Sequence, residues 1–180
     1  MPDTKNERQV PSGNDGGKPA APSLPKLNIC GDIGLKIARD GTWFYEGTPI
    51  GRKPLVKLFA SVLRREKDGF YLVTPVEKVP IEVEGEPFIA VGMSCEGEGK
   101  SQILTFRTNV DDVVAAGPSR KIGFRALKEG GQAPYVEVRD GLRAQLARSV
   151  YYELAELAVA AGEGSGVWSG GAFFPFPMES

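Results

Sequence analysis

The chain reads RDGTWFYEGTPIGR over residues 39–52. Asp40-Gly41 stands between two short runs of strand-forming residues, and both central residues of the type I′ turn that suits such a hairpin need a positive φ. The stretch therefore predicts a tight β-hairpin. The same tripeptide returns at Arg139-Asp140-Gly141. Each copy follows a strand-like run and precedes an amphipathic helix and an aromatic strand, which indicates an internally duplicated strand-helix-strand motif.

Two amphipathic helices are predicted beyond these turns. The first covers residues 53–67, because apolar residues recur there at i, i+3, i+4, i+7 and i+8. These residues are Leu55, Leu58, Phe59, Val62 and Leu63. Pro54 suits the first helical position, and Asp68-Gly69 ends the helix. The second helix covers residues 142–160, with Asp140 as its N-cap.

The remaining ordered chain is rich in predicted strands, and the fold class is α+β, built from two small α+β parts. Predicted strands lie at 70–73, 81–84, 88–93, 102–108, 113–114, 122–127 and 135–138. Residues 1–25 hold five prolines and no aromatic residue, so they are predicted to be a disordered tail. Residues 26–78 form the predicted N-terminal domain, and residues 79–180 form the C-terminal domain.

Composition excludes several classes of function. The chain has 180 residues, no histidine, two cysteines and a formal net charge of -1. Without histidine there is no Ser-His-Asp or Cys-His catalysis, and Cys30 and Cys95 cannot form a four-cysteine metal site within one chain. A net charge near zero gives no basic field for double-stranded nucleic acid. We therefore expect a protein without cofactor or metal that is not an enzyme.

The chain shows no sign of a membrane or secretory segment. No stretch reaches the roughly 20 apolar residues of a membrane span, and the first residues lack the apolar core of a secretory signal. Two isolated cysteines fit a reducing compartment. We expect cytoplasmic localisation.

Charge is distributed unevenly along the chain. Residues 1–78 carry 13 basic and 9 acidic side chains, a net +4, whereas residues 79–180 carry 9 and 14, a net -5. Opposite signs favour docking of the two halves and could line a cleft between them. Uneven scatter of solvated charges is an equally good interpretation.

Two familiar motifs are tested and rejected. Gly99-Lys100-Ser101 resembles the end of a phosphate-binding loop, but the pattern needs glycine at Ser94, and a strand rather than a helix is predicted to follow. Paired carboxylates suited to acid–base chemistry occur at Glu82/Glu84 and Asp111/Asp112. Glu82 and Glu84 lie on one side of a strand, opposite two apolar residues, which is typical of a solvated face.

Basic residues gather on or near the two predicted helices. Those of the first helix are Arg52, Lys53, Lys57, Arg64, Arg65 and Lys67, and those of the second are Arg139, Arg143 and Arg148. Arginine presents a planar fork of donors that suits phosphate or carboxylate. Nearby aromatic residues could stack on a base, namely Trp43, Tyr45 and Tyr151. The alternative is a solvated helix face with ion pairs to the acidic half.

Several stretches together resemble a bacterial family of unknown function, DUF1285. They are residues 40–52, 55–63, 69–78, 134–142 and 149–154, and the most specific is the W-x-Y-x-G-x-P-I-x-R pattern that begins at Trp43. The likeness spans roughly residues 27–176. It implies a two-part α+β fold with a duplicated motif and a C-terminal part superficially like a pleckstrin-homology domain. It also implies a ligand, of nucleotide type, in the cleft between the parts, with a role in signalling.

These observations predict a non-catalytic protein that binds a small anionic, nucleotide-like ligand between its two parts. The expected ligand-binding residues are Trp43, Tyr45, Arg52, Lys78, Arg139, Arg143 and Tyr151. The alternative is a protein–protein adaptor that docks a partner strand or helix on the C-terminal aromatic residues and a pleckstrin-like sheet edge.

Overall fold

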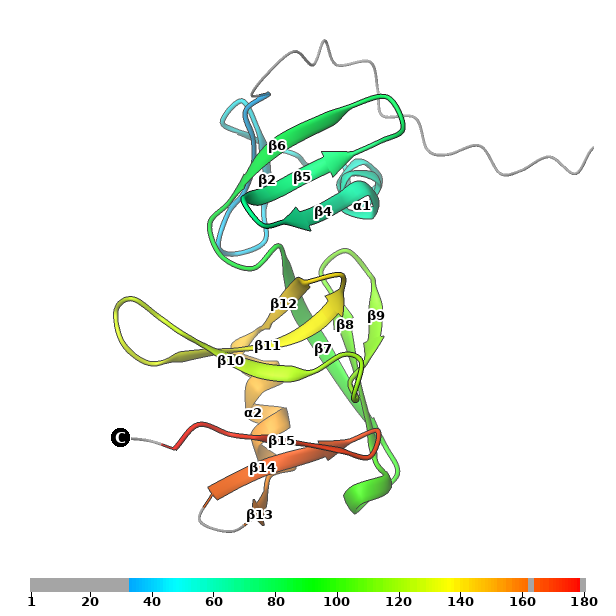
Figure 1. Cartoon of the computed structure of the whole chain (residues 1–180), viewed down its shortest axis with the longest axis vertical. Coiled ribbons are helices and arrows are strands. Elements are labelled where there is room, and N and C mark those ends of the chain that lie inside the picture. The colour runs from blue at the N-terminus through cyan, green and yellow to red at the C-terminus, as the bar shows by residue number, and fades with distance from the viewer. Residues whose placement is uncertain (1–32, 162–163, 179–180) are drawn as a thin grey trace, which may run out of the picture.

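The structure, a computed structural model, describes residues 33–161 and 164–178. This part of the chain is mostly β, with two α-helices and two curled six-stranded sheets. Figure 1 shows the two sheets as separate parts stacked along the long axis of the molecule. The predicted tail at residues 1–25 and Cys30 lie outside the described residues.

The elements follow one another along the chain in two groups. The first part comprises β1 (Leu35–Ile37), β2 (Trp43–Tyr45), β3 (Thr48–Pro49), α1 (Lys53–Val62), β4 (Leu63–Glu66), β5 (Gly69–Val73) and β6 (Lys78–Val83). The second part comprises β7 (Phe88–Glu96), a 3-10 turn η1 (Gly99–Ser101), β8 (Ile103–Thr108), β9 (Val113–Ala115), β10 (Ile122–Ala126), β11 (Gln132–Arg139), β12 (Leu142–Leu146), α2 (Arg148–Glu156), β13 (Val159–Ala161), β14 (Gly164–Ser169) and β15 (Ala172–Pro175).

The first sheet has the order β3-β2-β1-β6-β5-β4, and α1 packs on one face of it. In β1, Leu35 and Ile37 are buried while Lys36 points to the opposite face, as the period of a strand requires. β1 pairs with β2 antiparallel and with β6 parallel. Trp43 of β2 stacks on Phe59 of α1 with their ring centroids 6.0 Å apart, so the hairpin and the helix share one core.

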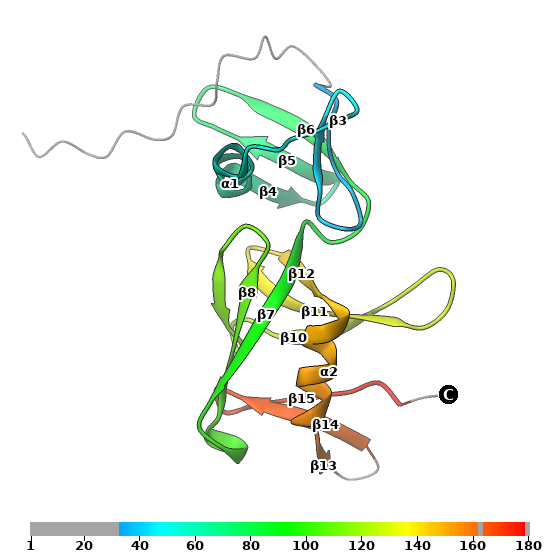
Figure 2. The same ribbon diagram turned by 180° about the vertical axis from the view of Figure 1, so that it is seen from behind.

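The second sheet has the order β10-β11-β12-β7-β8-β9, with a parallel pair where β12 meets β7. Figure 2 shows α2 lying beside this sheet in the reverse view. A three-stranded sheet, β13-β14-β15, completes the part. The buried Ser169 hydroxyl ties it to its neighbours: it accepts the Leu104 N–H at 2.9 Å and donates to the Ala116 carbonyl at 2.8 Å.

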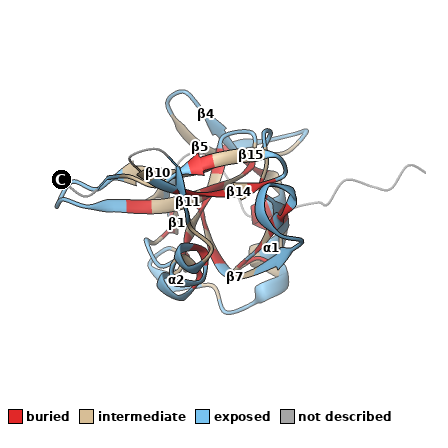
Figure 3. Ribbon diagram, turned by 90° about the horizontal axis from the view of Figure 1, so that it is seen from below, coloured by how far each residue is buried: buried red, intermediate tan, exposed pale blue. Residues whose placement is uncertain are grey.

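Buried residues follow the sheets, while both helices keep exposed outer faces (Figure 3). Fully buried large side chains occur in both parts, including Trp43, Leu63, Phe88, Phe106 and Leu154. Within the described residues, no helix is long and apolar enough to cross a membrane.

The predicted hairpin at Asp40-Gly41 is confirmed. Ile37 pairs with Trp43 across the turn, the Gly41 N–H donates to the Ala38 carbonyl at 2.9 Å, and Gly41 has a positive φ of 84°. The φ of Asp40 is not positive, so this turn is not the expected type I′; the second copy, with φ of 44° at Asp140 and 76° at Gly141, has the two positive values that type I′ requires. The strands expected along the rest of the chain are also present. Gly99–Ser101 leads into strand β8 and not into a helix, which agrees with the rejection of a phosphate-binding loop.

The predicted helix over residues 53–67 is too long. α1 ends at Val62, and Leu63–Glu66 forms strand β4, which turns through Lys67-Asp68 into β5, whose first residue is Gly69. Leu63 fits the apolar face of a helix and also, opposite Leu72, the buried face of a strand. Asp-Gly is a hairpin signal as well as a helix terminator, and here it lies where two paired antiparallel strands meet.

The predicted helix over residues 142–160 is wrong at its start, and Asp140 is not its N-cap. Leu142–Leu146 forms strand β12, and α2 begins only at Arg148. Leu142 and Leu146 satisfy both a four-residue helical spacing and a two-residue strand spacing. Ala144 is buried between them, so the strand period is the one that the structure uses.

The predicted domain boundary at residue 78 is also misplaced. Lys78–Val83 is β6, which pairs with β5 and β1 inside the first sheet. The connection between the two sheets therefore lies between Val83 and Phe88.

Candidate functional site

A polar cavity of about 420 Å³ lies where α1 of the first part meets the turn between β8 and β9 of the second part. Its lining residues are Lys57, Ala60, Ser61, Val110, Asp111, Asp112 and Arg139. The cavity is therefore formed by both parts, at the place where the sequence predicts a cleft. We call it the interdomain cleft.

Asp111 is the centre of the charge cluster in the interdomain cleft. Its Oδ2 lies 2.7 Å from Lys57 Nζ and 3.1 Å from Lys53 Nζ, and its Oδ1 lies 3.8 Å from an Arg107 guanidinium nitrogen. The hydrogen bonds from Lys57 and then Lys53 lower the pKa of Asp111 below its ordinary value. Asp111 therefore stays ionised and holds α1 against the second part.

Arg139 connects the same two elements from the other side of the cleft. One guanidinium nitrogen pairs with Asp112 Oδ2 at 3.0 Å, and the other donates to the carbonyl of Ala60 in the last turn of α1. A cation is favoured there, because helix C-termini carry partial negative charge. The guanidinium also lies 5.5 Å from the ring centroid of Phe88, which is fully buried.

The cluster carries an excess of positive charge. Lys53, Lys57, Arg107 and Arg139 bring four cations against the two carboxylates of Asp111 and Asp112. Such an arrangement can attract a small anion, and it can hold the anion by charge-assisted hydrogen bonds. Within the described residues, no group of three or more acidic, cysteine or histidine side chains could hold a metal ion.

Both Arg-Asp-Gly turns lie at the contact between the parts. The Gly41 carbonyl accepts a hydrogen bond from Asn109 Nδ2 at 3.3 Å, and the Gly141 carbonyl accepts one from Arg65 at 3.4 Å. Asn109 Oδ1 also accepts the Ile89 N–H at 3.0 Å, which fixes the amide. Each part therefore binds the turn of the other part.

Of the seven predicted ligand-binding residues, the structure places only Arg139 in the lining of the interdomain cleft. Trp43 is 1% exposed and stacks on Phe59, so it presents no face to a ligand. Tyr45 is half-buried against the core of the first part. Arg52 is exposed just before α1, where its carbonyl accepts the first N–H groups of the helix.

The other three predicted residues also lie outside the lining of the interdomain cleft. Lys78 pairs with Glu66 at 2.6 Å and covers the Tyr71 ring at 4.3 Å. Arg143 stacks on the ring of Tyr135 at 4.2 Å. Tyr151 belongs to an aromatic cluster in the second part.

The predicted site residues did not include five charged residues of this cluster, namely Lys53, Lys57, Arg107, Asp111 and Asp112. A sequence signal existed for four of them. Lys53 and Lys57 are four residues apart, on one face of the predicted basic helix, and Asp111-Asp112 is one of the two carboxylate pairs. Only the fold places that helix next to that pair.

Two further cavities lie outside the interdomain cleft. One, of about 580 Å³, lies on the first sheet and is lined by Lys36, Phe44, Pro80, Glu82 and other residues of β1, β2 and β6. The other, of about 1260 Å³, lies in the second part between the β10–β11 hairpin, α2 and the C-terminal segment. We call the second the aromatic groove, because Phe124, Tyr151 and Phe176 line it.

The fold and the cleft together define a two-part, mostly β protein with a charged cleft between its parts. The chain belongs to the DUF1285 family: the family's N-terminal domain model matches residues 25–86, and its C-terminal domain model matches residues 87–176. Both domains are described as of unknown function. The division between the models falls between β6 and β7, where the two sheets separate.

Two solved structures of DUF1285 family proteins are similar to this one. The protein from Silicibacter pomeroyi DSS-3 is 51% identical, with a TM-score of 0.77 over 81% of this chain and 80% of that chain. The protein from Shewanella baltica OS155 is 27% identical, with a TM-score of 0.55 over 69% of this chain and 91% of that chain. Among curated proteins, no relative matches the chain.

Proposed function

We propose that this protein is a non-catalytic, cytoplasmic module that binds a small anionic ligand of nucleotide type in the interdomain cleft and acts in signalling. The observation that carries the proposal is the convergence of four cations on Asp111 and Asp112, two carboxylates that line one cavity. The four cations are Lys53, Lys57, Arg107 and Arg139. Four cations against two carboxylates leave two positive charges without a carboxylate of their own. A phosphate group carries about that much negative charge.

The size and position of the cavity also support a small ligand. A volume of about 420 Å³ lies in the range of about 300–1,000 Å³ that is usual for small-molecule sites. No aromatic residue is among its described lining residues. Phosphate groups, and not base stacking, therefore provide the recognition in this proposal.

A ligand that bridges α1 and the β8–β9 turn would change how firmly the two parts are held together. That coupling is the physical basis of the proposed signalling role, since a ligand shifts a conformational equilibrium only by binding one arrangement better than another.

A thermal-shift panel of nucleotides and second messengers tests the proposal. At a concentration 100-fold above Kd, a ligand stabilises the protein by about 2.7 kcal/mol, which corresponds to about 5–10 °C in Tm for a chain of this size. Lys57→Gln should abolish most of this shift. Lys67→Gln is the matched control, because Lys67 is exposed and has no ion pair within the described residues. No shift with any member of the panel at millimolar concentration would contradict the proposal.

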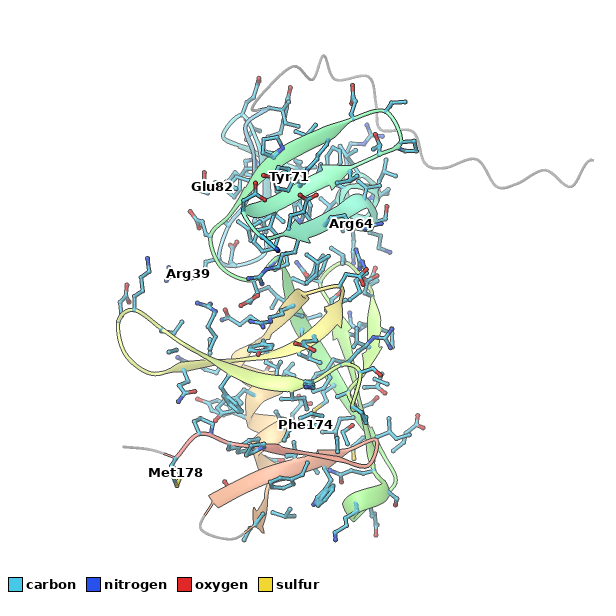
Figure 4. All side chains as sticks on the ribbon, in the orientation of Figure 1. Arg39, Arg64, Tyr71, Glu82, Phe174 and Met178 are labelled. Atoms are coloured by element: carbon cyan, nitrogen blue, oxygen red, sulfur yellow. The ribbon has the colours of Figure 1, made fainter. Side chains whose placement is uncertain are left out.

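A second function, a protein–protein adaptor, is favoured by the aromatic groove. Phe124, Tyr151 and Phe176 pack there with centroid distances of 5.6–6.3 Å, beside β10, which is an edge strand of its sheet. An extended peptide could add to that edge and place apolar side chains in the groove. Figure 4 shows Phe174 and Met178 of the C-terminal segment at the same end of the molecule.

Retention of a partner from cell extract would test the adaptor function. Phe176→Ala should lose the partner, whereas Val113→Ala should keep it, because Val113 is 67% exposed on the opposite edge strand, β9. Equal retention by both variants would exclude the groove as the docking site.

The duplication of the hairpin–helix unit is likewise a proposal. It is supported by the shared Arg-Asp-Gly turns and by the common order of hairpin, helix and antiparallel strands in β1–β5 and in β11–β14. We also propose that the second part has the superficial likeness to a pleckstrin-homology domain that the family resemblance implies, since its six-stranded sheet is followed by α2. Superposition of the two units, and of the second part on such domains, is the measurement that checks both.

A further inference from the structure

More cationic side chains pair with Asp111 than with any other carboxylate in the described part of the chain. Lys53 and Lys57 reach it from α1, and Arg107 reaches it from β8. A single carboxylate carries one negative charge and two acceptor oxygens. Three cations therefore converge on a group that can neutralise only one of them.

The fold, and not side-chain flexibility, places this carboxylate in the interdomain cleft. Asp111 has a φ of 65°, in a turn held by the buried Thr108. The Thr108 hydroxyl accepts the N–H groups of Val110 and Asp112, and the Thr108 N–H donates to the Asp112 carbonyl at 2.8 Å. The Asp111 side chain is 36% exposed, so its partners can be reached by a solute.

The lysines, in contrast, are able to move. Their side chains are 59% and 45% exposed and end long flexible stems. Each can turn its ammonium group from Asp111 toward another anion without any change in the backbone of α1.

We infer that Asp111 is an internal substitute for the phosphate group of the ligand. In the free protein its carboxylate holds Lys53 and Lys57. When a phosphate monoester binds, the two ammonium groups pass from Asp111 to phosphate oxygens, which are more numerous and carry more charge. The inference rests on the proposed function, and it names both the ligand group and the residue that competes with it.

The exchange has a consequence for the coupling of the two parts. It removes the ion pairs between α1 and the β8–β9 turn, and it leaves the Arg139 contact with the Ala60 carbonyl in place. Ligand binding would thus replace a direct contact between the parts by one through the ligand. If Asp111 is only a tether, removing its charge should weaken the contact and give no gain in phosphate binding.

Calorimetric titration with inorganic phosphate and with AMP, in phosphate-free buffer at constant ionic strength, tests the inference. Asp111→Asn should bind both probes about fivefold more tightly, because the competing charge is gone while asparagine tolerates the positive φ of this turn. Lys57→Gln should bind them about fivefold less tightly. Glu98→Gln is the control for Asp111→Asn, because it removes one negative charge at an exposed position without an ion pair within the described residues. It should bind both probes like the wild type.

The outcomes separate the inference from the proposed function. Unchanged or weaker binding by Asp111→Asn, together with a loss in Lys57→Gln, would overturn the inference and leave the anion site standing. Tighter binding by Glu98→Gln as well would attribute the gain to net charge and would also overturn it. No binding of either probe by the wild type or by Asp111→Asn would overturn both.

Discussion

The two Arg-Asp-Gly turns differ both in backbone and in surroundings. Gly41 and Gly141 have positive φ values of 84° and 76°, but Asp140 has a positive φ of 44° whereas the φ of Asp40 is not positive. Gly41 is buried: a Cβ there would lie 2.7 Å from Asn109 Nδ2 and 2.8 Å from Ile89 Cγ1. At the exposed Gly141 the nearest atom would be Arg65 Cδ at 3.6 Å. The same tripeptide therefore gives two different turns that share only the positive φ of the glycine, and the neighbouring part decides how much each turn tolerates.

The residues two positions beyond the turns extend the contrast. Trp43 lies opposite Ile37, and Arg143 lies opposite Glu137, at the same offset in each hairpin. Trp43 is enclosed in the core, whereas Arg143 lies half-buried across a tyrosine ring. The first hairpin places its side chain in the core against α1, whereas the second places its side chain across Tyr135 on the neighbouring strand of the same sheet.

The largest difference between the hairpins is expected on truncation of these two side chains. Trp43→Ala should lower the free energy of unfolding by about 3–5 kcal/mol, because it leaves a large cavity beside Phe59. Arg143→Ala should cost about 0.5–2 kcal/mol, the usual range for a cation–π contact between an exposed and a desolvated site. Urea denaturation at pH 7 measures both, and equal losses would show that the hairpins are buried alike.

The next largest difference in the free energy of unfolding is expected between alanine substitutions of the two turn glycines. Gly41→Ala should cost about 3 kcal/mol, since the strain of a positive φ adds to a clash with Asn109 and Ile89. Gly141→Ala should cost about 1 kcal/mol from the backbone strain alone. The same denaturation experiment checks the pair. A loss at Gly141 as large as that at Gly41 would mean that both turns are locked by the facing part.

Alanine substitutions of the two arginines that precede the turns should differ less in their loss of stability. Arg139→Ala removes contacts to Asp112 and to the Ala60 carbonyl and should cost about 2 kcal/mol. Arg39→Ala should cost less than about 0.5 kcal/mol, because the Arg39 side chain is exposed and pairs with no carboxylate within the described residues. If Arg39→Ala proved the more damaging variant, the contact between the parts would depend on the first turn instead.

The smallest effect is expected at the aspartates and depends on pH. The Thr42 N–H donates to Asp40 Oδ1 at 2.9 Å, and this bond lowers the pKa of Asp40 below 3.8. The lowered pKa means that Asp40 stabilises the folded state fully above about pH 4, and that this contribution is lost as pH falls through the lowered value. Asp40→Asn should therefore be less stable than the wild type at pH 6, and the difference should shrink toward pH 2.

Asp140→Asn is the comparison variant at neutral pH. Within the described residues the Asp140 side chain accepts no hydrogen bond, so its replacement should change the free energy of unfolding at pH 7 by less than about 0.5 kcal/mol. A constant difference between Asp40→Asn and the wild type from pH 6 to pH 2 would contradict the role of the Thr42 hydrogen bond.

The local signals in the sequence were read correctly where only one structure fitted them. The first hairpin, the strands of the second sheet and the core of α1 follow from turn chemistry and from hydrophobic period. The signals failed where two periods coincided. Leu63 and Leu142–Leu146 fit a helix face and a strand face equally well. Pairing with another strand decided between them: with the adjacent β5 for Leu63, and with the distant β7 for Leu142–Leu146.

The sequence pointed to a cleft between the two parts but missed most of the residues that line it, and the binding of a ligand there stays a prediction. The opposite charges of the two halves favoured a cleft, and Arg139 was named for it. Trp43 and Tyr45 were expected at a ligand because they lie near the basic residues in the sequence and could stack on a base. Burial depends on what packs over them, and α1 covers Trp43.

By itself, the sequence determined the family, the two Arg-Asp-Gly hairpins, the basic helix and the acidic pair at residues 111–112. These are local properties, set by backbone sterics, side-chain charge and spacing along a few residues. The tertiary structure alone decided that Lys53 and Lys57 meet Asp111, that Arg139 reaches the end of α1, and that Gly41 is locked while Gly141 is not. Those contacts join residues about 50 to 80 positions apart, so they exist only when both sheets have formed.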